Sequence, residues 1–269
     1  MGVNFFDFDS AYLLTSLLVI LAIQFLFFII ASILRSDVLT DITYALTFLV
    51  IVLLVLSFRE VIQVTHLVLT AMVVLWALRL GVYLLVRILH MGRDERFDGI
   101  REKPLRFLVF WTFQGISIWL ILWPSLFALT DGRGADWGLV RTAGVLVWLL
   151  GLVLESIADL QKYRFRSAPE NKGLFIHSGL YRHARHPNFL GEMLCWWGVF
   201  LVALPALEGW QWVAILGPLF LTLLLRFGTG VPTVSRKQGQ KYGHLPEFEH
   251  YLKNSNMFIP LPLFRARSA

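Results

Sequence analysis

The stretch Gly179–Gly198 reads GLYRHARHPNFLGEMLCWWG and changes character at Pro187. Before this proline the sequence is basic and turn-rich, and after it the sequence is apolar apart from Glu192. Proline suits the first turn of a helix, because its ring fixes φ and the first N–H groups of a helix lack partners in any case. A cluster of basic side chains therefore stands at the start of an apolar helix.

Two interpretations of this junction remain open. Fixed charges, side-chain donors and the free N–H groups of a helix start suit an anionic group such as phosphate. Alternatively, the Arg and His side chains of residues 181–186 meet lipid head groups where the helix enters a membrane. The carboxylate of Glu192 lies just inside the helix and has to face protein, water or ligand rather than lipid.

The composition is that of a membrane protein. Of the 269 residues, 57% are hydrophobic and only 16% are charged, whereas about a quarter are charged in soluble domains. The single cysteine, Cys195, excludes a disulfide framework and a Cys-based metal site. Because His183 and His186 stand among arginines, which repel a cation, we expect no metal site at all.

Seven apolar runs are each long enough, at about 20 residues, to cross a bilayer as a helix. They cover approximately 11–34, 38–58, 62–89, 106–129, 138–160, 187–207 and 210–231. We therefore predict an all-α, polytopic membrane protein with seven transmembrane helices. The charged tail after residue 231 is expected to form one or two short helices against the cytoplasmic mouth of the bundle.

The distribution of basic residues predicts the orientation. Most of the 24 Lys and Arg side chains fall in the segments 90–106, 161–186 and 232–269. With seven spans these three segments lie on one side, which the positive-inside rule assigns to the cytoplasm. We therefore expect the N-terminus outside and the C-terminus in the cytoplasm. The net charge of +6 then reflects topology, and no nucleic-acid partner is expected.

Ionisable side chains inside apolar runs are costly in a membrane, so each marks a candidate functional position. Two rows of such side chains follow helical spacing, which places the members of each row on one face. The rows are Arg79, Tyr83 and Arg87 in the third run, and Glu155, Asp159 and Lys162 in the fifth, extended by Arg166 if the helix continues.

Together with the basic segments, these rows predict a polar cavity that opens to the cytoplasm. A cation-rich cavity suits a large phosphorylated cofactor, because arginine binds phosphate with paired donors. No GxGxxG or Walker motif follows a strand, so a nucleotide would have to be held in another way. The alternative is that the charged side chains brace the helices as salt bridges, for example between Glu155 and Arg79 or Arg226.

The motif and its flanking sequences resemble a known family. The stretch 154–166 reads LESIADLQKYRFR and the stretch 241–260 reads KYGHLPEFEHYLKNSNMFIP. With Gly179–Gly198 they resemble the steroid 5-alpha-reductase-like membrane proteins, and most closely their DUF1295 branch, from about Arg79 to Pro260. The combination of NFLGE, the upstream Asp and Arg, and the tail tyrosine before IP carries the resemblance. The RHP motif alone is less specific, since isoprenylcysteine methyltransferases have a similar one.

This resemblance implies a reductase that binds NADPH and saturates an activated C=C bond of a lipophilic, steroid-like or isoprenoid substrate in the bacterial cytoplasmic membrane. The chain would be one domain, with substrate-side helices in 1–105 and the cofactor-binding half in 106–269. The small-molecule substrate and membrane lipid would be its partners. The implied cofactor-binding residues are Arg79, Asp159, Lys162, Arg166, Tyr181, Arg182, Arg185, His186, Asn188, Glu192, Lys241, Tyr242 and Tyr251.

The sequence departs from the steroid reductases in the proton-donating half of the site. Those enzymes have an early Gln-Glu pair, which is absent from the N-terminal third here. They also have a tyrosine three residues before Arg79, where this chain has Trp76. The N–H of tryptophan is too weak an acid to protonate a substrate, so another residue has to take this part.

Four residues are candidates for the missing proton donor, namely Asp41, Tyr44, His66 and Tyr83. Tyr83 is preferred because it lies on the polar face of its helix. With Glu192, it completes the predicted catalytic set.

Two other functions remain open. The first is a SAM-dependent methyltransferase of the isoprenylcysteine type, although SAM is cationic and the segment SRKQGQKYG (235–243) is strongly basic. The second is a non-catalytic lipid-binding protein, which the missing Gln-Glu pair favours.

Overall fold

The computed structural model describes residues 9, 11–34, 38–91, 99–132 and 137–262. Within these ranges the regular structure is helical, apart from an isolated parallel β-bridge. Seven helical segments of the described residues are long and apolar enough to cross a membrane. The all-α prediction with seven spans is confirmed, and the chain is an integral membrane protein.

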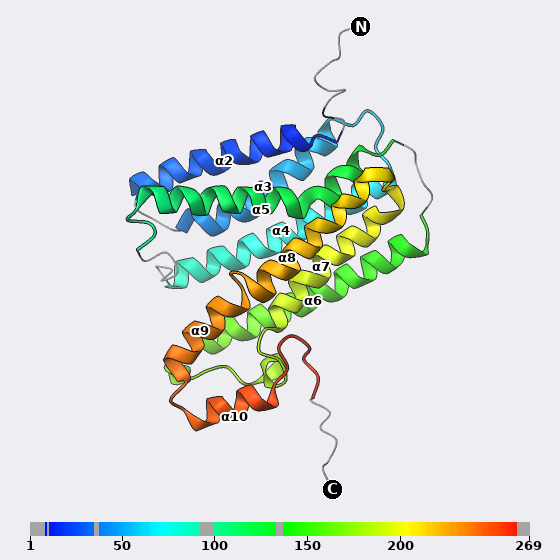
Figure 1. Ribbon diagram of the computed structural model, residues 1–269. Helices are drawn as coiled ribbons and strands as arrows, with labels where there is room; N and C mark the ends of the chain where they lie inside the picture. The colour runs from blue at the N-terminus through cyan, green and yellow to red at the C-terminus, as the bar shows by residue number, and fades with distance from the viewer. Residues whose placement is uncertain (1–8, 10, 35–37, 92–98, 133–136, 263–269) are drawn as a thin grey trace. The chain divides into compact units, whose positions relative to one another are not determined.

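The α-helices are labelled as in Figure 1. They are α2 (Leu13–Leu34), α3 (Val38–Ser57), α4 (Val64–Met91), α5 (Pro104–Thr130), α6 (Leu139–Ser167), α7 (Pro187–Ala203), α8 (Leu216–Phe227), α9 (Val231–Tyr242) and α10 (Pro246–Asn254). Short 3₁₀ turns connect some of them: η2 (Pro169–Asn171), η3 (Gly179–Arg182), η4 (Leu204–Ala206) and η5 (Gly209–Ile215). The seventh candidate span covers Gly209–Tyr242.

Prolines define several helix boundaries. α5, α7 and α10 each begin on a proline, the residue whose fixed φ suits a first turn. α6 ends at Ser167, because Ala168 precedes Pro169 and is therefore extended, with φ −81° and ψ 120°. The predicted end of this run at about residue 160 was too early, and the charged residues that follow belong to the helix.

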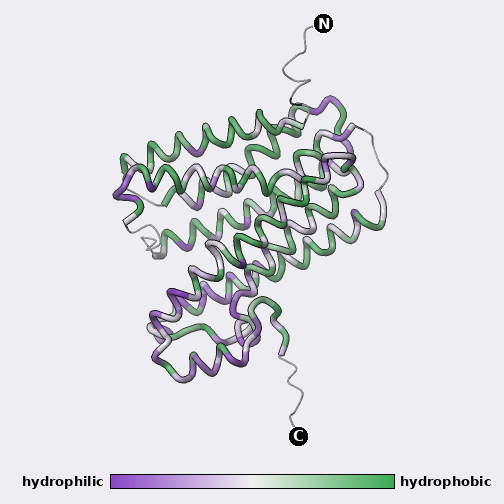
Figure 2. Tube along the Cα trace, viewed as in Figure 1, coloured by the Kyte–Doolittle hydropathy of each residue, from purple (hydrophilic) through white to green (hydrophobic). Residues whose placement is uncertain are grey.

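The tail forms two short helices, α9 and α10, as predicted. Both are hydrophilic over much of their length (Figure 2). A break at Gly230 separates α8 from α9, and a Cβ atom there would lie 2.3 Å from the carbonyl oxygen of Leu225. Some of the basic residues used to predict the orientation lie outside the described residues, namely Arg93, Arg96, Arg265 and Arg267.

The chain divides into two compact units. The first unit contains 1–146 and 196–220, and the second contains 147–195 and 221–269. The expected single domain with halves 1–105 and 106–269 stays a prediction. In the first unit α3 packs on α2 and α4, and α5 packs against all three.

An aromatic cluster forms part of the core of the first unit. The rings of Phe48, Trp76 and Trp196 lie 5.0–5.1 Å apart, centroid to centroid. Each of these side chains is at most 1% exposed. The tryptophan in the place of the expected catalytic tyrosine is therefore a packing residue of this core.

Candidate functional site

Close packing of α6 on α7 shapes the second unit. A Cβ atom on Gly191 would lie 2.6 Å from Cβ of Glu155, and one on Gly151 would lie 2.6 Å from the carbonyl oxygen of Gly191. The two backbones therefore meet without intervening side chains. This contact places the start of α7, which carries Asn188 and Glu192, beside the charged row of α6.

The charged row of α6 forms as its spacing predicted, and the helix includes Arg166. Glu155 and Asp159 are buried, at 3% and 5% exposure. Lys162 is half-buried and Arg166 is exposed. The row thus runs from buried carboxylates to cations at the surface.

The basic motif docks on α6 through Gln161. Its Oε1 atom accepts a hydrogen bond from the backbone N–H of Leu180 at 2.9 Å. Gly179 has a φ of +59°, and a Cβ atom there would lie 2.5 Å from the same Oε1 atom. Glycine suits this position because L-residues with a side chain rarely adopt this φ, and a Cβ atom would also displace the end of the Gln161 side chain.

The tail holds the motif from another direction. The N–H of Asn256 donates to the carbonyl oxygen of His183 at 2.7 Å. The N–H groups of Arg185 and His186 donate to the carbonyl oxygens of Asn256 and Met257 at 3.0 and 2.9 Å. This backbone pairing forms the parallel bridge between Ala184 and Asn256. Residues 183–186 therefore have a fixed backbone conformation.

His186 is neutral at physiological pH. It is 3% exposed, and its ring stacks on Phe189 with centroids 5.3 Å apart. Burial, followed by the positive charges of Lys162 and Arg185, lowers the pKa of His186 to about 3. The effect of Lys162 on this pKa indicates that the α6 row and the motif lie close together.

The predicted tyrosines of the site form hydrogen bonds with other residues of the chain. The hydroxyl of Tyr251 donates to the carbonyl oxygen of Tyr181 at 2.8 Å. The carbonyl oxygen of Ala184 lies 3.3 Å from the same hydroxyl and is a second acceptor. Burial raises the pKa of Tyr251 to about 12, so it keeps this proton. The hydroxyl of Tyr181 lies 3.5 Å from Oδ1 of Asn188, and that of Tyr242 donates to the carbonyl oxygen of Leu174 at 2.9 Å.

Aromatic rings connect the tail helices to the segment before the motif. Phe175 lies 5.8 Å from Tyr242, 5.1 Å from Phe248 and 5.4 Å from Tyr251, centroid to centroid. The ammonium group of Lys241 lies 5.3 Å from the ring of Tyr242. The second unit thus gathers the predicted residues of the motif and the tail on one scaffold.

Three predicted arginines make no ion pair with the described residues. They are Arg166, Arg182 and Arg185. Arg166 and Arg182 are exposed and Arg185 is half-buried. Nε of Arg185 lies 3.4 Å from the carbonyl oxygen of Asn256, so its terminal amino groups remain available. A guanidinium group without an ion pair can bind an anion.

The sequence analysis missed a hollow beside the motif. It has a volume of about 340 Å³ and is lined by Gln161, Arg164, Phe165, Asn171, Ser178 and Gly179. Arg164 falls in the basic segment 161–186 of the sequence but belongs to α6. The sequence does not indicate a role for Gln161, because its hydrogen bond with Leu180 joins positions 19 residues apart.

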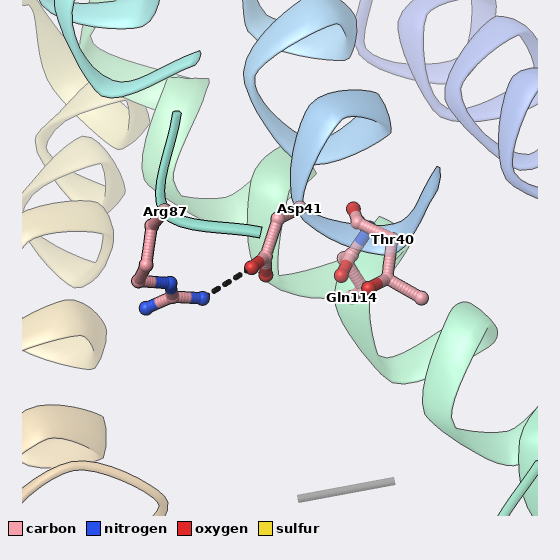
Figure 3. A network of polar contacts seen from close by, with 4 residues as sticks. All are labelled: Thr40, Asp41, Arg87 and Gln114. Atoms are coloured by element: carbon pink, nitrogen blue, oxygen red, sulfur yellow. Dashed lines mark hydrogen bonds and ion pairs between the residues drawn. The ribbon is translucent and has the colours of Figure 1, made fainter. Parts of the chain in front are cut away.

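The remaining predicted residues belong to the first unit. The guanidinium carbon of Arg79 lies 5.7 Å from the ring centroid of Tyr83. Arg87 forms an ion pair with Asp41 of α3 (Figure 3). These contacts connect members of the predicted α4 row to each other and to the preceding helix.

The other candidate proton donors of the first unit have structural contacts. His66 is fully buried, its Nδ1 accepts from the N–H of Gln63 at 3.3 Å, and its Nε2 lies 3.1 Å from the carbonyl oxygen of Asp131. The ring of Tyr44 packs edge-on against Phe48 and Trp76. Tyr83 stays the preferred candidate.

Comparison with known proteins identifies the family. Residues 27–255 match the family described as protein of unknown function (DUF1295). An uncharacterized protein of Schizosaccharomyces pombe (strain 972 / ATCC 24843) is 27% identical over 126 residues, which cover 39% of this chain and 37% of the yeast protein. No solved structure matches the chain. Because the family match extends over most of its length, the chain belongs to the DUF1295 family.

Proposed function

We propose that this protein is an NADPH-dependent membrane reductase that saturates an activated C=C bond of a lipophilic molecule, as its resemblance to the steroid 5-alpha-reductase-like proteins implies. The three arginines without an ion-pair partner among the described residues carry the proposal. If the charges existed only to brace the helices, these arginines would be expected to pair with carboxylates. They fit instead the requirements of a phosphorylated ligand.

The second unit contains the types of side chain that bind the groups of a dinucleotide. Arg166, Arg182 and Arg185 offer guanidinium donors for phosphate oxygens. Asn188 and Glu192 are half-buried in the first turns of α7, where the helix dipole favours a nearby anion. An amide and a carboxylate also suit a carboxamide or ribose hydroxyls. NADPH is therefore the cofactor that this set of donors and acceptors matches best.

The tyrosines of the tail contribute indirectly. Tyr251 uses its hydroxyl on the backbone of the motif, so its proposed part is to hold the segment that carries Arg182 and Arg185. The hydroxyl of Tyr242 bonds Leu174, outside that segment. Neutral His186 offers an imidazole without adding charge beside Lys162 and Arg185. Cofactor contact by Asp159, Lys162, Tyr181 and Lys241 stays part of the proposal.

The reaction needs a hydride and a proton. When bound, NADPH supplies the hydride for the β-carbon of the activated double bond and leaves as NADP⁺. Tyr83 is the proposed donor of the proton that the α-carbon takes up. Because Arg79 lies 5.7 Å from its ring centroid, a positive charge is at hand to stabilise the phenolate that remains.

The proposed setting is a bacterial cytoplasmic membrane with the C-terminal side in the cytoplasm, where NADPH is available. The substrate would reach the protein from the membrane, through the apolar helices of 1–105. These helices expose many large apolar side chains, such as Leu18, Phe25 and Ile33, which suits contact with lipid.

Ligand-induced stabilisation of the purified protein tests this function. We expect NADPH to raise the unfolding temperature in detergent more than NADH does. At about 100 times its Kd, NADPH should add about 2.7 kcal/mol to the free energy of unfolding. Arg166→Ala and Arg182→Ala should each weaken NADPH binding about tenfold or more, because each removes charge-assisted bonds. Arg236→Ala, which changes an exposed arginine of α9, is the matched control and should bind normally.

The same assay separates the alternatives. Stabilisation by SAM but not by NADPH would replace the reductase by a methyltransferase. Stabilisation by neither nucleotide would favour a lipid-binding protein without cofactor.

A further inference from the structure

A chain of hydrogen bonds connects α2, α3 and α5 inside the first unit. Nε2 of Gln114 donates to Oε1 of Gln24 at 3.1 Å, and Nε2 of Gln24 donates to Oγ1 of Thr47 at 3.1 Å. The hydroxyl of Thr47 donates in turn to the carbonyl oxygen of Thr43 at 2.6 Å. Gln24 and Thr47 are 1% and 0% exposed, so these bonds are sheltered from water.

The backbone of Thr40 fixes the orientation of the Gln114 amide. Nε2 of Gln114 lies 3.3 Å from the carbonyl oxygen of Thr40, an atom that can only accept. The amide nitrogen therefore commits both of its hydrogens, one to Thr40 and one to Gln24. The amide oxygen, Oε1, can only accept a hydrogen bond, and no described residue donates to it.

This oxygen can be reached by a small group. Gln114 keeps 9% of its surface exposed, and Oε1 is not among the fully enclosed, unpartnered atoms of the described residues. Gln114 lies ten residues into α5, which corresponds to about 15 Å along the helix. Where only acyl chains surround it, a carbonyl oxygen finds no donor, so a partner for Oε1 has to bring its own O–H or N–H group.

An ion pair adds polar character to the same region. Asp41 follows Thr40 in α3, and its carboxylate meets Arg87 of α4, whereas Gln114 reaches Thr40 from α5 (Figure 3). The side chains of Asp41 and Arg87 are 19% and 20% exposed. Three helices thus bring a carboxylate, a guanidinium and an amide oxygen together among apolar residues.

We propose that Oε1 of Gln114 binds the hydroxyl group of a lipid-soluble molecule. The amide has no hydrogen left to donate, so the ligand has to supply the donor. An alcohol meets this requirement, whereas an ether, ester or ketone of the same shape presents only acceptors and would leave Oε1 without a bond. This alcohol site is separate from the proposed cofactor function and requires no nucleotide.

Binding of 1-tetradecanol and of its methyl ether to the full-length protein in lipid nanodiscs tests the proposal without NADPH. The two probes have similar apolar chains, but only the alcohol carries an O–H donor. We expect the wild-type protein to bind the alcohol about tenfold more tightly than the ether, the usual effect of leaving a buried acceptor unpaired. Equal binding of the two probes by the wild type would overturn the proposal.

Two matched variants locate the effect. Gln114→Met removes the acceptor and should abolish the preference for the alcohol. Gln24→Met breaks the same hydrogen-bond chain but leaves Oε1 of Gln114, whose amide is still held by Thr40, and should keep the preference. A preference that survives in Gln114→Met, or that is lost equally in Gln24→Met, would contradict direct recognition by Gln114.

Discussion

The hydroxyl of Tyr251 donates a hydrogen bond to the backbone carbonyl oxygen of Tyr181, at 2.8 Å. This bond joins the helix α10 to the basic motif across 70 residues of sequence. With the bridge between Ala184 and Asn256, it makes the tail a structural part of the candidate site. The tyrosine that family resemblance assigned to the cofactor is thus engaged with the backbone that carries the arginines.

Removing this hydroxyl should loosen the motif. In Tyr251→Phe the carbonyl oxygens of Tyr181 and Ala184 lose their donor, at a cost of about 1 kcal/mol in unfolding free energy. NADPH binding should weaken several-fold, because the arginines are held less firmly. Thermal unfolding with and without NADPH measures both effects. Tyr242→Phe, which loses a bond to Leu174 outside the motif, should lower stability without a comparable loss of NADPH affinity.

The stability should fall in mild acid because of His186. Its pKa is about 3 in the folded protein and 6.5 in the unfolded chain, so only unfolding lets it take up a proton between these values. The stabilising effect of the neutral form is complete above pH 6.5 and is lost progressively towards pH 3. Between pH 7.5 and 5.0 the loss is about 2 kcal/mol.

His186→Gln should remove this part of the pH dependence, measured as the change in unfolding temperature between the two pH values. His244→Gln changes an exposed histidine and should retain the wild-type dependence. An equal acid sensitivity of wild type and His186→Gln would show that the histidine is already accessible to protons in the folded state.

The contact between α6 and α7 should not tolerate a methyl group. In Gly191→Ala the new Cβ atom would lie 2.6 Å from backbone and side-chain atoms of Glu155, so the helices have to separate. We expect a loss of about 3 kcal/mol, as for overpacked cores, together with weaker NADPH binding. Gly239→Ala provides the control, since nothing lies within 4 Å of a Cβ atom there and alanine should stabilise α9 by up to about 1 kcal/mol.

The identity of the proton donor can be tested separately from cofactor binding. Tyr83→Phe should reduce turnover of an enone substrate at least 100-fold and leave stabilisation by NADPH unchanged. Tyr44→Phe keeps the ring that packs on Phe48 and Trp76 and should retain turnover. The opposite result for the two variants would transfer the role to Tyr44.

The seven spans could be predicted because long apolar runs have few alternatives in a protein of this composition. The end of α6 was harder to place, because charged residues such as Lys162 and Arg166 are compatible with a loop or with a helix that leaves the membrane. Only Pro169 marks the true boundary, through its effect on Ala168. Helix start signals were more reliable, and Pro187 begins α7 as expected.

The candidate site was predictable in its residue types but not in its connections. Charge spacing along a helix shows which side chains share a face, and the α6 row formed accordingly. Backbone pairing of residues 183–186 with Asn256 and Met257 leaves no such pattern, since it depends on main-chain atoms that every residue has. The burial of Trp76 was likewise not evident, because its partner Trp196 comes from a helix 120 residues later.

The pairing of the tail with the motif has a consequence for biosynthesis. Asn256 is translated 71 residues after Arg185, when α7 and α8 have already been made. Until then the arginine-bearing segment lacks the tail residues that pair with its backbone. A nascent chain interrupted in α9 would therefore contain the helices up to α8 but lack the residues that pair with the backbone of 183–186.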